Sequence, residues 1–224
     1  MADQDSENTP ESQAYDLIRL GDVDSDLDSF ADAEQNYLKA VAAFDDLIQA
    51  RPADLGARAG RAVAYTRMGG AQGEENRHRD AMKSYARALE DWDFYLAAAP
   101  SFADAWYGKG TALFNLGNSQ SELIEHEKAE QTYKRAIACF DQALRRAQDD
   151  ASFHSIKGKA LVALSLEYRF LNRPQEEWLA MVELAHEEFS EALQIDPDDY
   201  RLQRLRDQME ELLGEGDEDD DEEE

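Results

Sequence analysis

The sequence has few of the residues that most often build catalytic or metal sites. Its 224 residues include one cysteine, Cys139, and four histidines. One cysteine cannot form an internal disulfide, and its position beside Phe140 in a helical pattern predicts a buried thiol. The histidines are scattered, at positions 78, 126, 154 and 186, and indicate neither a zinc set nor a Cys-His pair. We therefore expect no catalytic residue, no metal and no cofactor.

Long apolar runs are missing as well. No uncharged apolar stretch approaches the about 18 residues of a membrane span. The opening Met-Ala-Asp-Gln-Asp lacks the basic start and the apolar stretch of a signal peptide. A Gly-Lys-Ser phosphate loop and a dinucleotide-binding fingerprint do not occur. These absences favour a cytoplasmic, non-enzymatic protein that contacts no membrane.

Basic residues are scarce. Lys and Arg number 23 against 50 Asp and Glu, which gives a net charge of -27. Residues 1–34 hold eleven acids and one base, and residues 215–224 hold nine acids and no base. Most of the excess charge therefore lies at the two ends of the chain. Because no face is dense in basic residues, nucleic acid is not an expected partner.

The sequence does contain a repeat of 48 residues. A large apolar residue followed by a small one recurs as Leu20-Gly21, Met68-Gly69, Leu116-Gly117 and Leu164-Ser165. A small residue four positions before an aromatic one recurs at spacings of 48 or 49, at Ala40 and Phe44, Ala88 and Trp92, Ala136 and Phe140, and Ala185 and Phe189. Small residues let two helices approach closely, and the aromatic ring fills the next gap. Each repeat therefore predicts an antiparallel helix pair.

The repeats resemble the tetratricopeptide repeat (TPR) family. The third repeat matches the family pattern at Trp106, Gly110, Leu113, Gly117, Ala136, Phe140 and Ala143, and the fourth ends on the family's Ile195-Asp196-Pro197. The resemblance covers about residues 11–197. A TPR unit has about 34 residues, so each repeat here is about 14 residues longer. Four extra helical turns would lengthen both helices of a pair by about two turns and keep them in phase.

The resemblance implies an all-α fold: a right-handed α-solenoid of four elongated TPR-like helix pairs followed by a capping helix. The expected boundaries are residues 1–10 for a disordered acidic N-terminus, 11–52, 53–100, 101–150 and 151–197 for the repeats, 198–213 for the capping helix and 214–224 for a disordered acidic tail. The cap is expected because the last repeat of an array needs a cover with one polar face.

Several local expectations follow from individual residues. We expect the first helix to end near Gly21, and the acidic run 22–28 to start the next helix, since it lacks the central Gly and closing Glu of a calcium loop. Three glycines in residues 69–73 predict a break in the second repeat. In the third, Ser121 predicts the start of a helix of about 25 residues. Residues 172–174 predict a turn, and Gly214 predicts the end of the last helix.

Two Glu-x-x-His segments raise the alternative of a metal site. Glu75 and His78 match this spacing, as do Glu183 and His186. The distance between the two segments is not a multiple of the repeat period, so their places within the repeat differ. We therefore do not expect them to face a common site.

In TPR proteins the first helix of each pair lines a concave groove, and the resemblance places a set of residues on that face. They are Tyr15, Arg19, Arg67, Tyr107, Thr111, Phe114, Asn115 and Lys159, together with Ile18, Val63, Thr66 and Val162. Aromatic, basic and amide side chains suit an extended or helical peptide. The carboxylate clamp of chaperone-binding TPR proteins is absent, since the corresponding positions hold other residues, among them Ser152 and Ile156.

The sequence therefore predicts a TPR scaffold or adaptor that binds a protein or peptide partner in its groove. An alternative is an acidic, chaperone-like protein that shields a basic client through its charged ends. The sequence leaves the partner and the oligomeric state open.

Overall fold

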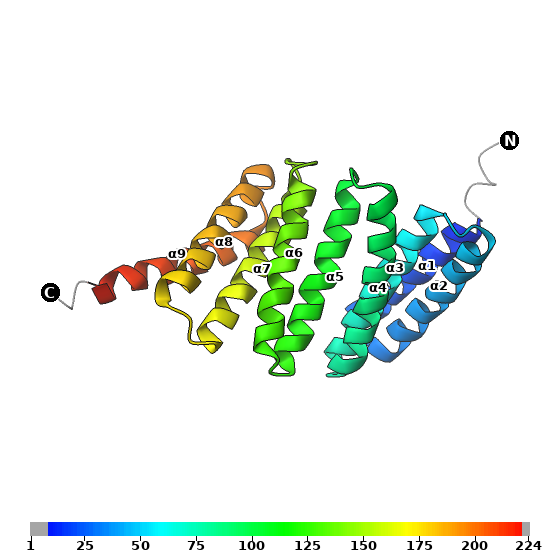
Figure 1. Cartoon of the computed structure of the whole chain (residues 1–224), viewed down its shortest axis with the longest axis horizontal. Helices are drawn as coiled ribbons and strands as arrows, with labels where there is room; N and C mark the ends of the chain where they lie inside the picture. Colours follow the sequence, from blue (N-terminus) through cyan, green and yellow to red (C-terminus); the bar gives the residue numbers. More distant parts are fainter. Residues whose placement is uncertain (1–8, 221–224) are drawn as a thin grey trace. The chain divides into compact units, whose positions relative to one another are not determined.

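The computed structural model of the chain describes residues 9–220, and the side chains of residues 9–214. Nine helices and no strand occur in this part of the chain, so the predicted all-α fold is confirmed (Figure 1). The chain divides into two compact units, residues 1–101 and residues 102–224, which are described separately. Most of the expected acidic N-terminus, residues 1–8, and the last four residues of the expected tail lie outside the described residues.

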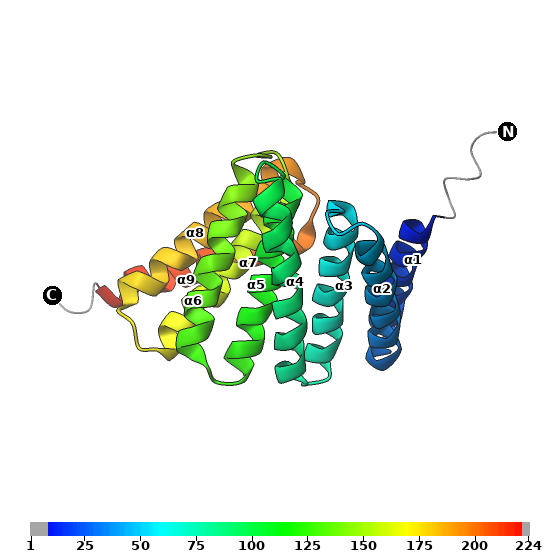
Figure 2. The same ribbon diagram turned by 45° about the vertical axis from the view of Figure 1, so that its right-hand side comes forward.

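Unit 1 consists of two helix pairs. Its helices are α1 (Pro10–Asp26), α2 (Phe30–Ala50), α3 (Leu55–Glu74) and α4 (His78–Ala98). Each helix packs on the next, and α1 also touches α3. Figure 2 shows α3 lying beside α4, to which it is joined by a short turn. Phe44, Tyr37 and Ala40 are fully buried between α2 and its neighbours, and so form the centre of the core.

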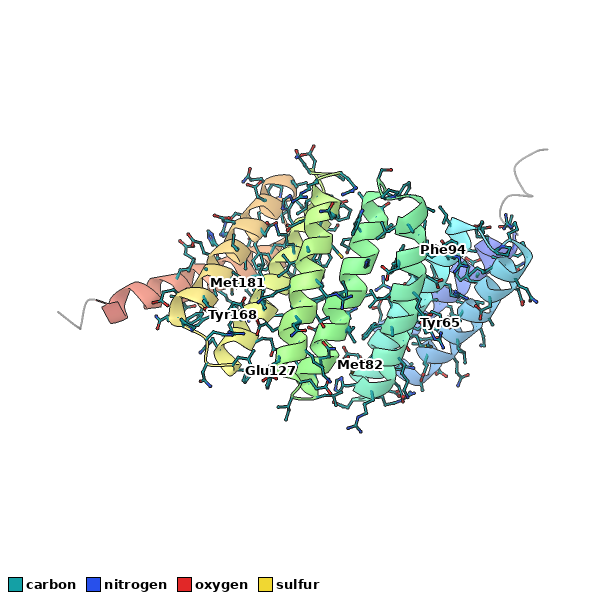
Figure 3. All side chains as sticks on the ribbon, in the orientation of Figure 1. Tyr65, Met82, Phe94, Glu127, Tyr168 and Met181 are labelled. Carbon is teal, nitrogen blue, oxygen red and sulfur yellow. The ribbon has the colours of Figure 1, made fainter. Side chains whose placement is uncertain are left out.

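Unit 2 repeats this arrangement and adds a ninth helix. Its helices are α5 (Ala103–Glu122), α6 (His126–Leu144), α7 (Ala151–Phe170), α8 (Gln175–Ile195) and α9 (Tyr200–Asp220). Packing is again sequential, with an additional contact between α5 and α7. Tyr168 of α7 and Met181 of α8 lie close together in one apolar cluster (Figure 3). Helix α9 buries Leu202 and Met209 and so covers the free side of α8.

Glycine–aromatic contacts hold the helices of both units together. A Cβ atom placed on Gly117 would lie 2.6 Å from the ring of Tyr133, and one on Gly110 would lie 2.5 Å from the ring of Phe140. Real Cβ atoms do not approach a ring so closely, so each of these positions requires the missing side chain. Equivalent contacts join Gly21 with Tyr37, Gly69 with Tyr85 and Gly158 with Phe189. The glycines that we expected near the helix ends therefore lie inside the helices.

The turn within each pair has the same backbone conformation. One residue with positive φ occurs in each turn, at Asp28, Asn76, Ile124 and Asn172, again at the spacing of the repeat. The following N–H donates to a carbonyl five residues earlier, as from Glu125 to Gln120 at 2.8 Å. This is the Schellman motif, which ends a helix on a left-handed residue. Asn and Asp tolerate that conformation, whereas the β-branched Ile124 adopts it at a cost in energy.

Side-chain caps begin the first helix of most pairs. Thr9 accepts a hydrogen bond from the backbone of Ser12 at 3.1 Å, Asp54 from Ala57 at 3.1 Å and Asp150 from Ser152 at 2.9 Å. Such caps satisfy N–H groups that have no partner inside the helix. The second helices have no side-chain cap and start directly after the turn.

Four local expectations are corrected. Helix α3 runs unbroken through residues 69–73, because Gly69 packs against Tyr85 and the other glycines are tolerated. The acidic run 22–28 ends α1 instead of starting a helix. The single long helix expected after Ser121 is divided, since α5 continues to Glu122 and α6 begins at His126. Helix α9 continues past Gly214 to Asp220.

Lateral ion pairs join neighbouring helix pairs within each unit. In unit 1 the Arg77 guanidinium donates to both carboxylate oxygens of Glu34, at 2.5 and 3.2 Å. In unit 2 Arg173 donates to both oxygens of Glu130, at 3.2 and 3.0 Å. In both pairs the Arg immediately follows the left-handed residue of a turn. The turn geometry therefore places this charge at the same point of each unit.

No helix among the described residues is both long enough and apolar enough to cross a membrane.

Candidate binding site on the inner face of unit 2

A cavity of ≈ 280 Å³ opens between α5, α7 and the start of α9. We call the surface around it the inner face of unit 2. Its lining residues are Tyr107 from α5, Ala151, Ser152, Ser155, Ile156 and Lys159 from α7, and Asp196, Asp199 and Leu202 at the start of α9. Two of the predicted groove residues, Tyr107 and Lys159, are therefore brought together here.

Helix α7 supplies most of the lining because of its residue spacing. Ser155 and Ser152 precede Lys159 by four and seven residues, which places all three on one face of the helix. Ile156 lies beside them and adds an apolar surface. The cap from Asp150 fixes the helix start directly below Ser152. The cavity thus has two hydroxyl groups, one isoleucine and one ammonium group along a single helix.

Lys159 is the only basic residue in the cavity lining. It is exposed and forms no ion pair or hydrogen bond with a described residue. Asp196 and Asp199 stand across the cavity on the α9 side. Asp199 also accepts hydrogen bonds from the backbone N–H groups of Arg201 and Leu202, at 2.9 and 3.2 Å, and so caps α9. The cavity can therefore receive a negatively charged group beside Lys159 and a hydrogen-bond donor beside Asp196 and Asp199.

Tyr107 forms the α5 wall of the cavity, and its ring is held in place by two aromatic contacts. It stacks on Phe153 with a centroid distance of 4.8 Å and lies tilted against Phe140 at 6.2 Å. Phe140 and Phe153 are both buried. A rigid aromatic wall costs little conformational entropy when a ligand binds, which suits a recognition surface.

Beyond the cavity, the same face of α7 becomes apolar. Leu166 lies seven residues after Lys159, and its side chain is 46% exposed; Phe170, one turn further, is 63% exposed. The Phe170 ring stacks on His126 with a centroid distance of 4.8 Å and an interplanar angle of 13°. His126 in turn contacts the buried carboxylate of Glu167 at 2.8 Å through Nδ1. The position of Phe170 on the inner face is therefore fixed through His126 by a buried carboxylate.

The other predicted residues of unit 2 lie on or near this face with internal roles. The Thr111 hydroxyl donates to the carbonyl of Tyr107 at 3.0 Å. Phe114 is half-buried, and its ring lies 6.0 Å from that of Tyr133. Asn115 is half-buried on α5, and Val162 packs into the α7–α8–α9 core. These residues support the inner face, but none of them lines the cavity.

In unit 1 the predicted groove residues are engaged with neighbours. The Tyr15 ring packs edge-on against Phe44 at 5.2 Å, and burial together with nearby Glu11 raises the pKa of its hydroxyl. Arg19 pairs with Asp16. Arg67 lies 3.4 Å from Asp22, which also accepts a 2.8 Å hydrogen bond from the Tyr37 hydroxyl.

The remaining three positions of unit 1 are structural. Ile18 is buried, Val63 packs against the core, and Thr66 donates its hydroxyl to the carbonyl of Ala62 at 2.8 Å. The predicted residues of unit 1 are thus not gathered around a described cavity.

Sequence reasoning missed most of the lining. Ser155 and Ile156 could have been found from Lys159, because they precede it by one helical turn on the same face. Asp196, Asp199 and Leu202 could not, since their contribution depends on where α9 begins relative to α5 and α7. Ser152 and Ile156, which correspond to family clamp positions, do line the cavity but carry no charge.

A second cavity of ≈ 580 Å³ in unit 2 is lined mainly by charged residues of α6, α7 and α8. Lys157 lies between Asp141 and Glu188, at 2.7 and 2.8 Å, and His154 contacts Glu188 at 2.8 Å. Burial alone would lower the pKa of Lys157, but the two carboxylates outweigh it and the pKa is raised. These charges satisfy each other. No group of three potential metal ligands occurs among residues 9–214.

The comparison with known families agrees with the repeat architecture. The family model described as a tetratricopeptide repeat matches residues 71–132, which run from the end of α3 into α6. The predicted resemblance to the TPR family is thereby confirmed for these residues.

Two solved structures match the chain at low sequence identity. MamA from Desulfovibrio magneticus RS-1 (residues 41 to the end) is 18% identical, with a TM-score of 0.44, over 87% of this chain and 80% of that chain. TTC0263, a thermophilic TPR protein of Thermus thermophilus, is 17% identical, with a TM-score of 0.43, over 88% of this chain and 98% of that chain. No curated protein matches the sequence.

Proposed function

We propose that the protein is a non-enzymatic TPR scaffold that binds a protein or peptide partner on the inner face of unit 2. The observation that carries this proposal is Lys159, which pairs with no described residue, in a cavity walled by Tyr107, with exposed Leu166 and Phe170 further along the same helix face. A charge without a partner and large apolar side chains in solvent are typical of a surface that awaits a ligand.

The spacing along α7 defines the ligand. Lys159 and Leu166 are seven residues apart, or about 10 Å along a helix, and Phe170 is about 16 Å from Lys159. An extended peptide advances about 3.3 Å per residue. The ligand is therefore a peptide segment with an acidic residue, and an apolar residue three to five positions away. Its carboxylate pairs with Lys159, and its backbone N–H groups can donate to Asp196 or Asp199.

The proposal also includes a class of partner, a cellular compartment and the absence of a cofactor. The acidic composition disfavours nucleic acid as a partner, because phosphate contacts need clustered basic residues. The one cysteine is buried, so no disulfide stabilises the fold, and this favours the reducing cytoplasm. The scaffold needs no cofactor, since binding at this face involves no chemical step.

Peptide selection tests the site directly. A random peptide library is panned against the full chain, against Lys159→Glu and against Lys128→Glu. Lys128 is a matched control, because it is an exposed lysine of α6 that pairs with Glu125 and does not line the cavity. The wild type and Lys128→Glu should enrich peptides with an acid and an apolar residue at the stated spacing. Lys159→Glu should bind them at least tenfold more weakly. Equal enrichment by all three proteins would contradict the proposal.

Salt separates this proposal from the alternative in which the charged ends hold a basic client. Contacts with the cavity and with Leu166 and Phe170 should survive about 0.5 M salt, where exposed charges are screened within a few ångströms. Capture through the acidic ends should be lost. A truncation to residues 1–213 removes nine acids and should leave peptide affinity at high salt unchanged.

A further inference from the structure

The exposed side of α1 carries an apolar stripe that unit 1 leaves uncovered. Leu20 and Val23 of α1 and Leu27, which directly follows the helix, are spaced as i, i+3 and i+7 and are 49%, 53% and 70% exposed. This spacing puts Leu20 and Val23 on one face of α1, with Leu27 at the end of that face. We call them the leading stripe. The face lies away from the buried positions Ala14, Ile18 and Gly21, by which α1 packs on α2 and α3.

The positions equivalent to Leu20 and Val23 are buried by a neighbouring helix in the second and fourth pairs, whereas Leu116 of the third pair is half-buried and Glu75, one repeat after Leu27, is exposed. One repeat after Leu20 and Val23 stand Met68 and Ala71, which are 8% and 2% exposed in the core that α3 shares with α2. Two repeats further on, Leu164 packs with Ala129 and Tyr133 of α6.

In each of these cases the second helix of the preceding pair covers the position. The leading stripe is therefore shaped to receive a helix, and among the described residues no helix lies there.

The charges around the leading stripe specify what kind of helix fits. Asp24, Asp26 and Asp28 lie at the end of α1, where the helix dipole is already negative. Asp24 accepts a hydrogen bond from Asn36, but Asp26 and Asp28 form no ion pair with a described residue. The stripe is thus bordered by two carboxylates, Asp26 and Asp28, with which no described residue of unit 1 forms an ion pair. A partner with basic residues beside its apolar face would supply the missing cations.

A second copy of the chain fits this surface poorly. Two α1 helices placed face to face would bring the same aspartates together, with like charges opposed. The outward side of α9 is also unsuitable, because its exposed residues after Tyr200 are polar or charged, among them Arg201, Gln203, Arg204 and Asp207. Neither surface offers apolar side chains flanked by positive charge.

We propose that the leading stripe of α1 docks a basic amphipathic helix of a partner protein, separately from the inner face of unit 2. The partner helix occupies the place that the second helix of a preceding pair takes elsewhere in the fold. Its apolar residues cover Leu20, Val23 and Leu27, and its lysines or arginines face Asp24, Asp26 and Asp28. The scaffold then holds two ligands of different chemistry, a helix at this surface and an extended acidic peptide at the inner face.

The test uses the full chain and a fluorescently labelled helical peptide of about five turns, with leucines at helical spacing and lysines on both borders. Its control peptide has glutamate in place of each lysine. Anisotropy titration should show binding of the lysine peptide and at least tenfold weaker binding of the glutamate peptide. The double substitution Asp26→Asn with Asp28→Asn should weaken binding of the lysine peptide, and the loss should be larger at low salt than at high salt.

Matched substitutions locate the binding surface. Val23→Asp with Leu27→Asp should weaken the lysine peptide at least tenfold, whereas Leu38→Asp should change its affinity less than twofold. Leu38 is a suitable control because its side chain is 57% exposed on α2, outside the leading stripe. Melting temperatures of all variants should match the wild type, since the replaced side chains are exposed.

Two results would overturn the proposal. One is an affinity that Val23→Asp with Leu27→Asp leaves unchanged or raises, as Leu38→Asp does, because unspecific attraction of a basic peptide to an acidic protein grows with each added aspartate. The other is a concentration-dependent dimer, seen by light scattering, that Val23→Asp with Leu27→Asp dissociates, which would identify a second copy as the occupant. Lys159→Glu should leave binding of the lysine peptide unchanged, so that failure of this proposal and failure of the inner-face proposal are distinguishable.

Discussion

Units 1 and 2 share one apolar framework but differ in how each holds its most deeply buried carboxylate. In unit 1 the Asp91 side chain, 2% exposed, accepts from Arg61 at 2.7 and 2.8 Å and from Arg58 at 3.1 Å. In unit 2 the Glu167 side chain, also 2% exposed, contacts the imidazole of His126, its one polar side-chain partner among the described residues. Two guanidinium groups hold the first carboxylate, and one imidazole ring holds the second.

This difference separates what the repeat dictates from what it leaves free. The glycine–aromatic contacts recur at the repeat spacing because helix packing demands small residues at those points. The buried carboxylates do not recur: one repeat before Glu167 stands Ser119, and one repeat after Asp91 stands Cys139. Neutral buried polar side chains do recur at the repeat spacing, at Asn36, Ser84 and Thr132 and at Gln72 and Gln120. The repeats therefore diverge through their buried charges while their packing stays the same.

Removing each buried carboxylate should give the largest change in the free energy of unfolding and should show whether the two units differ as described. Asp91→Ala leaves two arginines without their main partner, and we expect the free energy of unfolding to fall by about 3 kcal/mol. That is near the low end for a broken buried pair, because Arg61 keeps its contact with Asp45. Glu167→Ala should cost less, about 1–2 kcal/mol, since it removes one contact with an imidazole instead of three hydrogen bonds from guanidinium groups. Urea unfolding of both variants measures the difference, and a larger loss for Glu167→Ala would contradict it.

Substitutions at glycine should show that the shared framework is sterically fixed. Gly110→Ala drives a methyl group against Phe140, and we expect a loss of about 1–3 kcal/mol; Gly110→Trp and Ala136→Trp should be worse. Gly70→Ala is the control. Nothing lies within 4 Å of its added Cβ, and alanine favours a helix by up to about 1 kcal/mol over glycine. Thermal melts should therefore shift in opposite directions for the two alanine variants, and equal shifts would contradict the packing described.

The turns allow a sharper test, because the four left-handed positions share one backbone conformation but hold different residue types, and one of them holds isoleucine. Ile124→Asn relieves a β-branched residue at φ 61°, and we expect a gain of about 1 kcal/mol. The reverse change, Asn76→Ile at φ 59°, should cost a similar amount. Urea midpoints measure both. A stabilising Asn76→Ile would mean that the left-handed conformation does not govern these turns.

The smallest effect concerns acid stability through the lateral ion pairs. Hydrogen bonds from Arg77 lower the pKa of Glu34 below its ordinary value of 4.5. For Glu130, burial acts upward, but Lys134 and Arg173 outweigh it and the pKa is again lowered. A lowered carboxyl pKa contributes stability above about pH 4.5 that is lost as the pH falls below this value. Glu34→Gln and Glu130→Gln should therefore flatten the fall of unfolding free energy between pH 5 and pH 3. If the unfolding free energy of the variants falls with pH as steeply as that of the wild type, these ion pairs do not contribute to the acid sensitivity of the fold.

Much of the fold was predictable because its determinants are local. The pairs Ala40 with Phe44 and Ala136 with Phe140 are fully buried, as their spacing predicted. The expected turn at residues 172–174 separates α7 from α8.

The errors arose where a distant neighbour decides the local structure. Residues 69–73 stay helical because Gly69 receives the ring of Tyr85, which the local sequence does not show. The turn at Ile124 was missed because isoleucine normally disfavours a left-handed residue. The inner face was only partly predicted, since the contribution of Asp199 depends on tertiary packing.

The extra length of the helices changes how much surface each repeat can offer. Helix α7 has 20 residues and so spans about 30 Å, against about 20 Å for a helix of 14 residues. The cavity residues 151–159 occupy only its first half, and Leu166 and Phe170 occupy the second. In the complex that we propose, one helix therefore offers a ligand two contacts along its length, where a shorter repeat has room for one. The ligand would then select this protein by the distance between two contacts on a single helix, without reaching across several repeats.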